Sequence, residues 1–155
     1  MGGRGARTLG VMLLVGLPGG CRTREGAEPL RTSGASVRVE RARARLTPAQ
    51  VGAVYLSVVN ATESADRLLS AESSSATKVE LHEVVAREDV LSMVMHPEGF
   101  PIPAGGRVEL VPGGKHLMLY NVRASADGID LLLRFEKTGA VRLNVPVVAA
   151  DEDMR

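Results

Sequence analysis

The chain has little cysteine, few aromatic rings and no long apolar run. Its 155 residues include one cysteine, no tryptophan, and two each of tyrosine and phenylalanine. A single cysteine excludes an intrachain disulfide, and so few aromatic rings leave no stacking platform for single-stranded nucleic acid. The formal net charge of +1 shows no basic excess, so we expect no nucleic-acid partner.

Catalytic signatures are absent too. The sequence contains no Gly-X-Ser-X-Gly elbow, no phosphate-binding loop and no metalloprotease helix motif. The Ser73-Ser74-Ser75 run has no base nearby that the sequence identifies. The sequence therefore favours a binding protein over an enzyme.

Residues 1–21 are typical of a bacterial export signal. Arg4 and Arg7 form a positive start, and residues 9–17 form an apolar segment too short to span a bilayer as a helix. Small residues then precede Cys21, as a lipoprotein cleavage site requires. We expect cleavage and lipidation at Cys21 and location in the bacterial periplasm or cell envelope, anchored to the membrane. Plain secretion, with Cys21 in an unstructured arm, is the alternative.

The rest of the chain predicts one all-β domain over residues 37–149. Residues 22–36 are rich in Gly, Ser and charged side chains, which is typical of a flexible tether, and residues 150–155 form an acidic tail. Short runs of β-forming residues separated by turn residues favour an antiparallel sandwich or barrel. After an early strand near 38–45, the expected strands are 53–60, 78–85, 90–95, 107–111, 116–122, 129–136 and 141–148, with turns at 60–66, 97–106, 112–114 and 126–128.

Soft metal ligands are concentrated between residues 82 and 118. All three histidines and three of the six methionines lie there. Alternate residues of a strand share a face, so His116 and Met118 point the same way, as do Met93 and Met95. Imidazoles with thioethers suit Cu(I) better than Zn²⁺, Mg²⁺ or Ca²⁺. A blue-copper carrier would need a cysteine within the domain, and none is present.

At these residues the chain resembles the periplasmic copper chaperones of the PCu(A)C family, whose signature is His, ten residues, Met, about twenty-one residues, then His-X-Met. His82 and Met93 have ten residues between them, and His116-Leu117-Met118 closes the pattern. Twenty-two residues separate Met93 from His116, and twenty separate Met95 from it. Met93 is the predicted ligand and Met95 its alternative. Further landmarks are residues 52–60, 65–68, 102–106 and 108–110.

The resemblance implies a cupredoxin-like β-sandwich that binds Cu(I) through His82, Met93, His116 and Met118. It also implies delivery of copper to a cytochrome c oxidase subunit, directly or through another copper assembly factor. Two alternatives stay open: a periplasmic copper buffer or resistance protein, and a metal-free envelope interaction module whose Met/His cluster is incidental.

Three further polar residues lie near the predicted ligands. His96 is either an auxiliary ligand or a histidine of an exposed turn, and we favour the turn. Glu83 and Glu98 carry hard oxygen donors, so their expected role is solubility or partner docking.

Overall fold

The computed structural model describes residues 37–88 and 90–149. The predicted signal peptide, the lipidation site at Cys21, the tether and the acidic tail lie outside these residues. Within the described ranges there are ten strands and no helix, and hence no helix able to cross a membrane. The strands are β1 (Val37–Leu46), β2 (Gly52–Asn60), β3 (Asp66–Glu72), β4 (Lys78–Arg87), β5 (Val90–Met95), β6 (Phe100–Ile102), β7 (Arg107–Leu110), β8 (Lys115–Tyr120), β9 (Ile129–Phe135) and β10 (Gly139–Val145).

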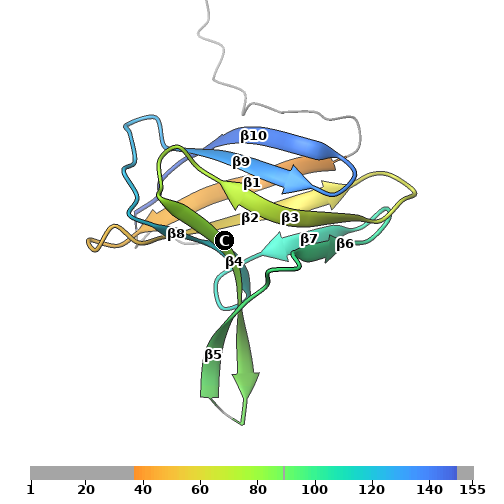
Figure 1. Cartoon of the computed structure of the whole chain (residues 1–155), viewed down its shortest axis with the longest axis horizontal. Helices are drawn as coiled ribbons and strands as arrows, with labels where there is room; N and C mark the ends of the chain where they lie inside the picture. Colours follow the sequence, from red (N-terminus) through yellow and green to blue (C-terminus); the bar gives the residue numbers. More distant parts are fainter. Residues whose placement is uncertain (1–36, 89, 150–155) are drawn as a thin grey trace, which may run out of the picture.

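The strands form two antiparallel sheets that face each other (Figure 1). One sheet has the order β1-β2-β8-β4-β5, with β7 also paired to β2, and the other has the order β10-β9-β3-β6. Strand β2 pairs with β8 near its start and with β7 nearer its end. After the short connection from β7, strand β8 therefore lies in the middle of the first sheet, between β2 and β4.

Alternating apolar residues hold the two sheets together. In β9, Ile129, Leu131, Leu133 and Phe135 are buried while the residues between them are more exposed. This alternation is the period of a half-buried strand. Opposite them, the first sheet contributes Val54, Leu56, Val58, Leu81, Leu117 and Leu119 to the core. Side chains that alternate with these core residues lie on the outer face of the first sheet.

The all-β prediction is confirmed, with two strands missed. The sequence predicted turns over residues 60–66 and 97–106, but β3 begins at Asp66 and β6 occupies Phe100–Ile102. Strand β3 contains several residues with low β-strand propensity, such as Asp, Ala and Glu. Strand β6 contains Pro101, which a strand tolerates only at a sheet edge, and β6 lies at such an edge.

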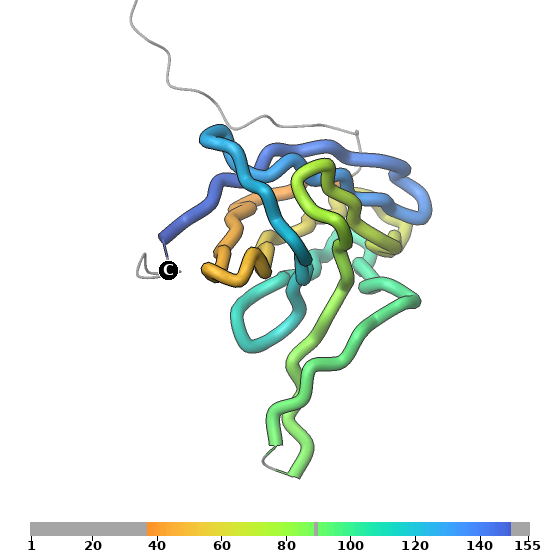
Figure 2. Tube along the Cα trace, turned by 60° about the vertical axis from the view of Figure 1, so that its left-hand side comes forward, coloured from red at the N-terminus to blue at the C-terminus, as the bar shows by residue number. Residues whose placement is uncertain are grey.

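The β4–β5 hairpin extends away from the body of the sandwich (Figures 1 and 2). The outermost pair of its strands is Arg87 with Val90. Glu88 has a φ of 49°, the left-handed conformation that two-residue hairpin turns require. Strand β5 pairs only with β4 among the described strands, so it is an edge strand. Two of the four predicted ligands lie on this hairpin: His82 on β4 and Met93 on the edge strand β5.

Candidate metal centre

Two predicted ligands, His82 and His116, lie side by side with Met95, the alternative to Met93, across three neighbouring strands. His82 on β4 is paired with His116 on β8 and with Met95 on β5. Directly paired residues of antiparallel strands point to the same face, so the three side chains form one row. The row lies on the outer face of the sheet, because the neighbouring residues Leu81 and Leu117 are buried in the core. Residues far apart in the sequence thus meet at one edge of the sandwich.

The two remaining methionines lie on either side of this row. Met118 is paired with Glu80, and Met93 is paired with Val84. With strands about 4.8 Å apart and about 3.4 Å per residue, a flat sheet would place the Cα atoms of Met118 and Met95 about 12 Å apart, and those of Met118 and Met93 about 17 Å apart. A compact set with Met118 therefore favours Met95, which the spacing pattern gave as the alternative.

His116 is held by the loop before β8. Its Nδ1 lies 3.0 Å from the carbonyl oxygen of Gly114, which also accepts a hydrogen bond from the backbone N–H of Val84 at 3.1 Å. Gly113 turns this loop with a φ of 75°, a conformation that glycine adopts without strain. The carbonyl can only accept, so Nδ1 carries the proton and Nε2 keeps its lone pair. His116 is buried despite lying on the outer face.

His82 has one ring nitrogen engaged and one without a partner. Its Nε2 lies 3.2 Å from Oε2 of Glu80, two residues away on the same face of β4. Its Nδ1 is buried and has no hydrogen-bond partner among the described residues. The ring centroids of His82 and His116 are 6.0 Å apart. A buried polar atom without a partner is costly, and here the atom belongs to the central residue of the row.

Glu80 is a site residue that the sequence reasoning did not identify. Its carboxylate is 2.5 Å from the ammonium of Lys78 and 3.2 Å from the His82 ring. Hydrogen bonds from Lys78, His82 and Tyr120 lower the pKa of Glu80 to about 2, with Lys78 making the largest contribution. The sequence does contain a signal for Glu80, because residues two apart on a strand share a face and Glu80 lies two residues before His82.

Tyr55 also flanks the site. Its ring centroid lies 6.3 Å from that of His116, and the planes are tilted by 50°. Burial raises the pKa of Tyr55, although Arg45 opposes the shift. The phenol is therefore neutral near pH 7 and adds no charge beside the imidazole. Tyr55 extends the row on the side away from Met95.

His96 is engaged elsewhere. Its Nε2 is 2.9 Å from Oε2 of Glu83, and its Nδ1 is 3.0 Å from Oε1 of Glu98. Glu83 also binds the ammonium of Lys115 at 2.6 Å. With both ring nitrogens facing carboxylates, His96 links the end of β5 to its neighbours. These contacts favour a structural role for His96, Glu83 and Glu98 over coordination.

The methionines of β5 are accessible. Met93 is 52% exposed and Met95 is 49% exposed. Within the described residues, no three His, Cys, Asp or Glu side chains are grouped so that they could hold a metal ion. A metal bound between His82 and His116 would therefore need thioether ligands, and a soft, neutral set of this kind suits Cu(I).

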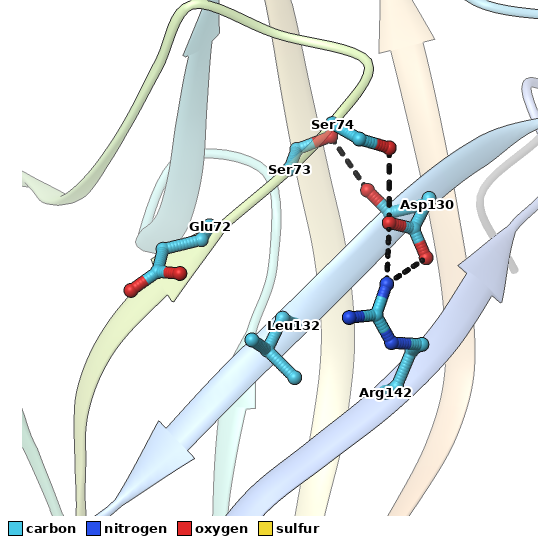
Figure 3. Close-up of a pocket in the computed structure, with 6 residues that line it drawn as sticks. All are labelled: Glu72, Ser73, Ser74, Asp130, Leu132 and Arg142. Atoms are coloured by element: carbon cyan, nitrogen blue, oxygen red, sulfur yellow. Dashed lines mark hydrogen bonds and ion pairs between the residues drawn. The ribbon is translucent and has the colours of Figure 1, made fainter.

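A separate surface hollow of about 200 Å³ lies in the second sheet (Figure 3). Its Asp130 carboxylate accepts hydrogen bonds from Arg142 at 2.9 Å and from the Ser74 hydroxyl at 3.1 Å. The Ser73 hydroxyl donates to the backbone carbonyl of Asp130 at 2.5 Å. These groups serve to hold β9 and the β3–β4 turn together.

The chain matches one protein family and a curated relative. The family described as "Putative lipoprotein LpqE-like" matches residues 37–147. The relative, named "Putative lipoprotein Lxx21020" from Leifsonia xyli subsp. xyli, is 32% identical over 114 residues, which are 72% of this chain and 69% of the relative. The family match spans all ten of the described strands.

Solved structures with the same architecture include copper-binding domains. The copper-bound PCuAC domain from PmoF2 is 27% identical, with a TM-score of 0.60, and the likeness covers 74% of this chain and 93% of that one. The solution structure of CuI-DR1885 from Deinococcus radiodurans is 21% identical, with a TM-score of 0.57 over 81% and 84% of the two chains, and supports the fold alone. The predicted PCu(A)C resemblance and cupredoxin-like sandwich are confirmed.

Proposed function

The chain belongs to the LpqE-like lipoprotein family, and from this premise we propose that it is an exported Cu(I) carrier and not an enzyme. The observation that carries the proposal is the row of His116, His82 and Met95 across three strands, in which the Nδ1 atom of His82 has no hydrogen-bond partner among the described residues. The 27% identical PCuAC domain from PmoF2 is copper-bound, which supports copper as the cargo.

The proposed ligands are His82, His116, Met118 and Met95. The spacing of the family signature favours Met93 instead, but in the observed register Met93 lies two residues farther along the strand from Met118 than Met95 does. Pairing His82 with Met95 needs two more residues in the hairpin and one fewer in the following segment than the family spacing. Met93 remains the alternative, and substitution of each methionine separates the two sets.

The ligand set fits a carrier. Two imidazoles and two thioethers are all neutral, so the bound ion keeps its single positive charge and no thiolate holds it. Met95 lies on an edge strand and is half exposed. A partner's ligands can therefore approach the ion before those of this chain have left it. Such stepwise ligand exchange favours transfer over permanent retention.

We propose the assembly of a copper centre of cytochrome c oxidase as the destination, either directly or through another assembly factor. This proposal rests on the family resemblance. Lipidation of Cys21 would hold the carrier at the membrane where such a client resides, and the family's lipoprotein description supports this anchor. A copper buffer or resistance protein would use the same site without a dedicated client.

The first test is Cu(I) titration of the reduced full-length chain against a chromophoric chelator. One ion per chain, lost on replacement of His82 or His116 with Ala, supports the carrier. A folded chain that binds no Cu(I) contradicts it and leaves the envelope interaction module. Deletion in the source bacterium then separates the two copper functions: loss of oxidase copper at low copper supply indicates delivery, whereas copper sensitivity with a normal oxidase indicates a buffer.

A further inference from the structure

Resting on the proposed function, we propose that the two histidines bind Cu(I) through different ring nitrogens: His82 through Nδ1 and His116 through Nε2. Glu80 is the positioning residue that imposes this on His82.

The assignment for His116 follows from its loop. A neutral imidazole has one N–H donor and one lone pair. Its Nδ1 lies 3.0 Å from the carbonyl oxygen of Gly114, which can only accept a hydrogen bond. The proton is therefore on Nδ1, and Nε2 is left to bind the metal. The same carbonyl binds the Val84 N–H, which ties the orientation of the ring to β4.

The assignment for His82 is the reverse. The partner of its Nε2 is the Glu80 carboxylate at 3.2 Å, which also accepts only. The proton is therefore on Nε2, and the lone pair is on Nδ1. That atom is buried and has no partner among the described residues. A Cu(I) ion in the row would supply the partner that this atom lacks.

Glu80 is well held for this role. Its other carboxylate oxygen binds Lys78 at 2.5 Å, and the ammonium of Lys78 lies 5.7 Å from the ring centroid of Tyr120. The Glu80 side chain is 16% exposed, so water competes little for its oxygens. Partners of this kind orient a ligating imidazole and raise its basicity, and their removal commonly weakens metal binding by about 10–100-fold.

Long-range ¹H–¹⁵N correlation spectra of the full-length ¹⁵N-labelled chain test the assignment before any copper is added. At neutral pH we expect the Nε2–H tautomer for His82 and the Nδ1–H tautomer for His116, with substitution of each histidine assigning the signals. Cu(I) should then shift Nδ1 of His82 and Nε2 of His116. The same tautomer at both histidines, or a metal shift at Nε2 of His82, overturns the assignment.

Variants of Glu80 test the positioning role. Glu80→Ala removes the acceptor, so His82 should populate both tautomers and the Cu(I) affinity should fall about 10–100-fold. Glu80→Gln keeps an acceptor oxygen and should restore both the tautomer and most of the affinity. Glu72→Ala is the control, because it removes an ion-paired carboxylate, 2.7 Å from Arg134, on β3 of the second sheet. It should leave the tautomer and the affinity unchanged.

The outcomes distinguish this inference from the proposed function. If the Glu80→Ala variant binds Cu(I) as tightly as the wild type and keeps the same His82 tautomer, the role of Glu80 is overturned. The proposed function as a Cu(I) carrier is not affected by that result. A wild-type chain that refuses Cu(I) overturns the proposed function, whatever the apo tautomers are.

Discussion

Replacing Met95 with Leu should weaken Cu(I) binding far more than replacing Met93 with Leu. The two methionines are matched, since they lie on the same face of the same strand and are 49% and 52% exposed. Leucine keeps most of the apolar volume but has no lone pair. A difference between the two variants therefore reports coordination and not packing.

The register sets the expected size of the difference. Met95 is directly paired with His82, whereas Met93 is paired with Val84, two residues nearer the hairpin tip. Met95→Leu removes one of four metal ligands, which should weaken binding at least as much as removal of a residue that hydrogen-bonds to a ligand. We therefore expect about a 100-fold rise in Kd for Met95→Leu, or ~2.7 kcal/mol. Met93→Leu should change Kd by less than about 3-fold, ~0.7 kcal/mol.

The assay is competition with a Cu(I) chelator under anaerobic, reducing conditions, with urea unfolding run in parallel. Because both side chains are about half exposed, each substitution should change the free energy of unfolding by less than about 0.5 kcal/mol. The reasoning is refuted if Met93→Leu weakens binding more than Met95→Leu while both variants remain folded.

Three further predictions concern the pH dependence and the scaffold. Cu(I) affinity should fall as the pH is lowered, because protons compete with the metal for the ring nitrogens of His82 and His116; an affinity that does not change with pH would count against both ligands. Burial opposes ionisation of Asp66, but hydrogen bonds from Thr138 and from neighbouring backbone N–H groups lower the pKa of Asp66 overall. The ionised carboxylate therefore stabilises the fold fully above about pH 4, and this stabilisation is lost as the pH falls through the folded-state pKa. Urea unfolding of Asp66→Asn should show a free energy of unfolding ~3 kcal/mol lower at neutral pH. That free energy should also change less with pH in the acid range than it does in the wild type. Leu117→Ala should lower the free energy of unfolding by ~3 kcal/mol, because Leu117 is fully buried; a loss below ~1 kcal/mol in urea unfolding would show that the core beneath the site is loosely packed.

Strands with strong alternation or β-branched residues were predictable. The prediction of 90–95 coincides with β5, and the alternation over 129–136 gave β9 to within a residue. Strands β3 and β6 were not predictable, because they are extended by pairing and not by local preference: β6 pairs with β3, and β3 pairs also with β9. Proline in β6 is read as a turn signal unless its position at a sheet edge is already known.

The candidate site was predictable as a set of residue types, and its geometry was not. A spacing pattern counts residues along the chain, whereas coordination depends on which residues lie opposite each other. Here the outermost pair of the hairpin makes that choice: Arg87 lies opposite Val90, and every pair down to His82 with Met95 follows from it. Moving the turn one residue toward the N-terminus would instead place Met93 opposite His82, because pairing positions in a hairpin shift by two for each residue that the turn moves. The family spacing and the observed register therefore differ by one turn position, and the identity of the thioether ligand depends on the chemistry of a hairpin tip about five residues away from it.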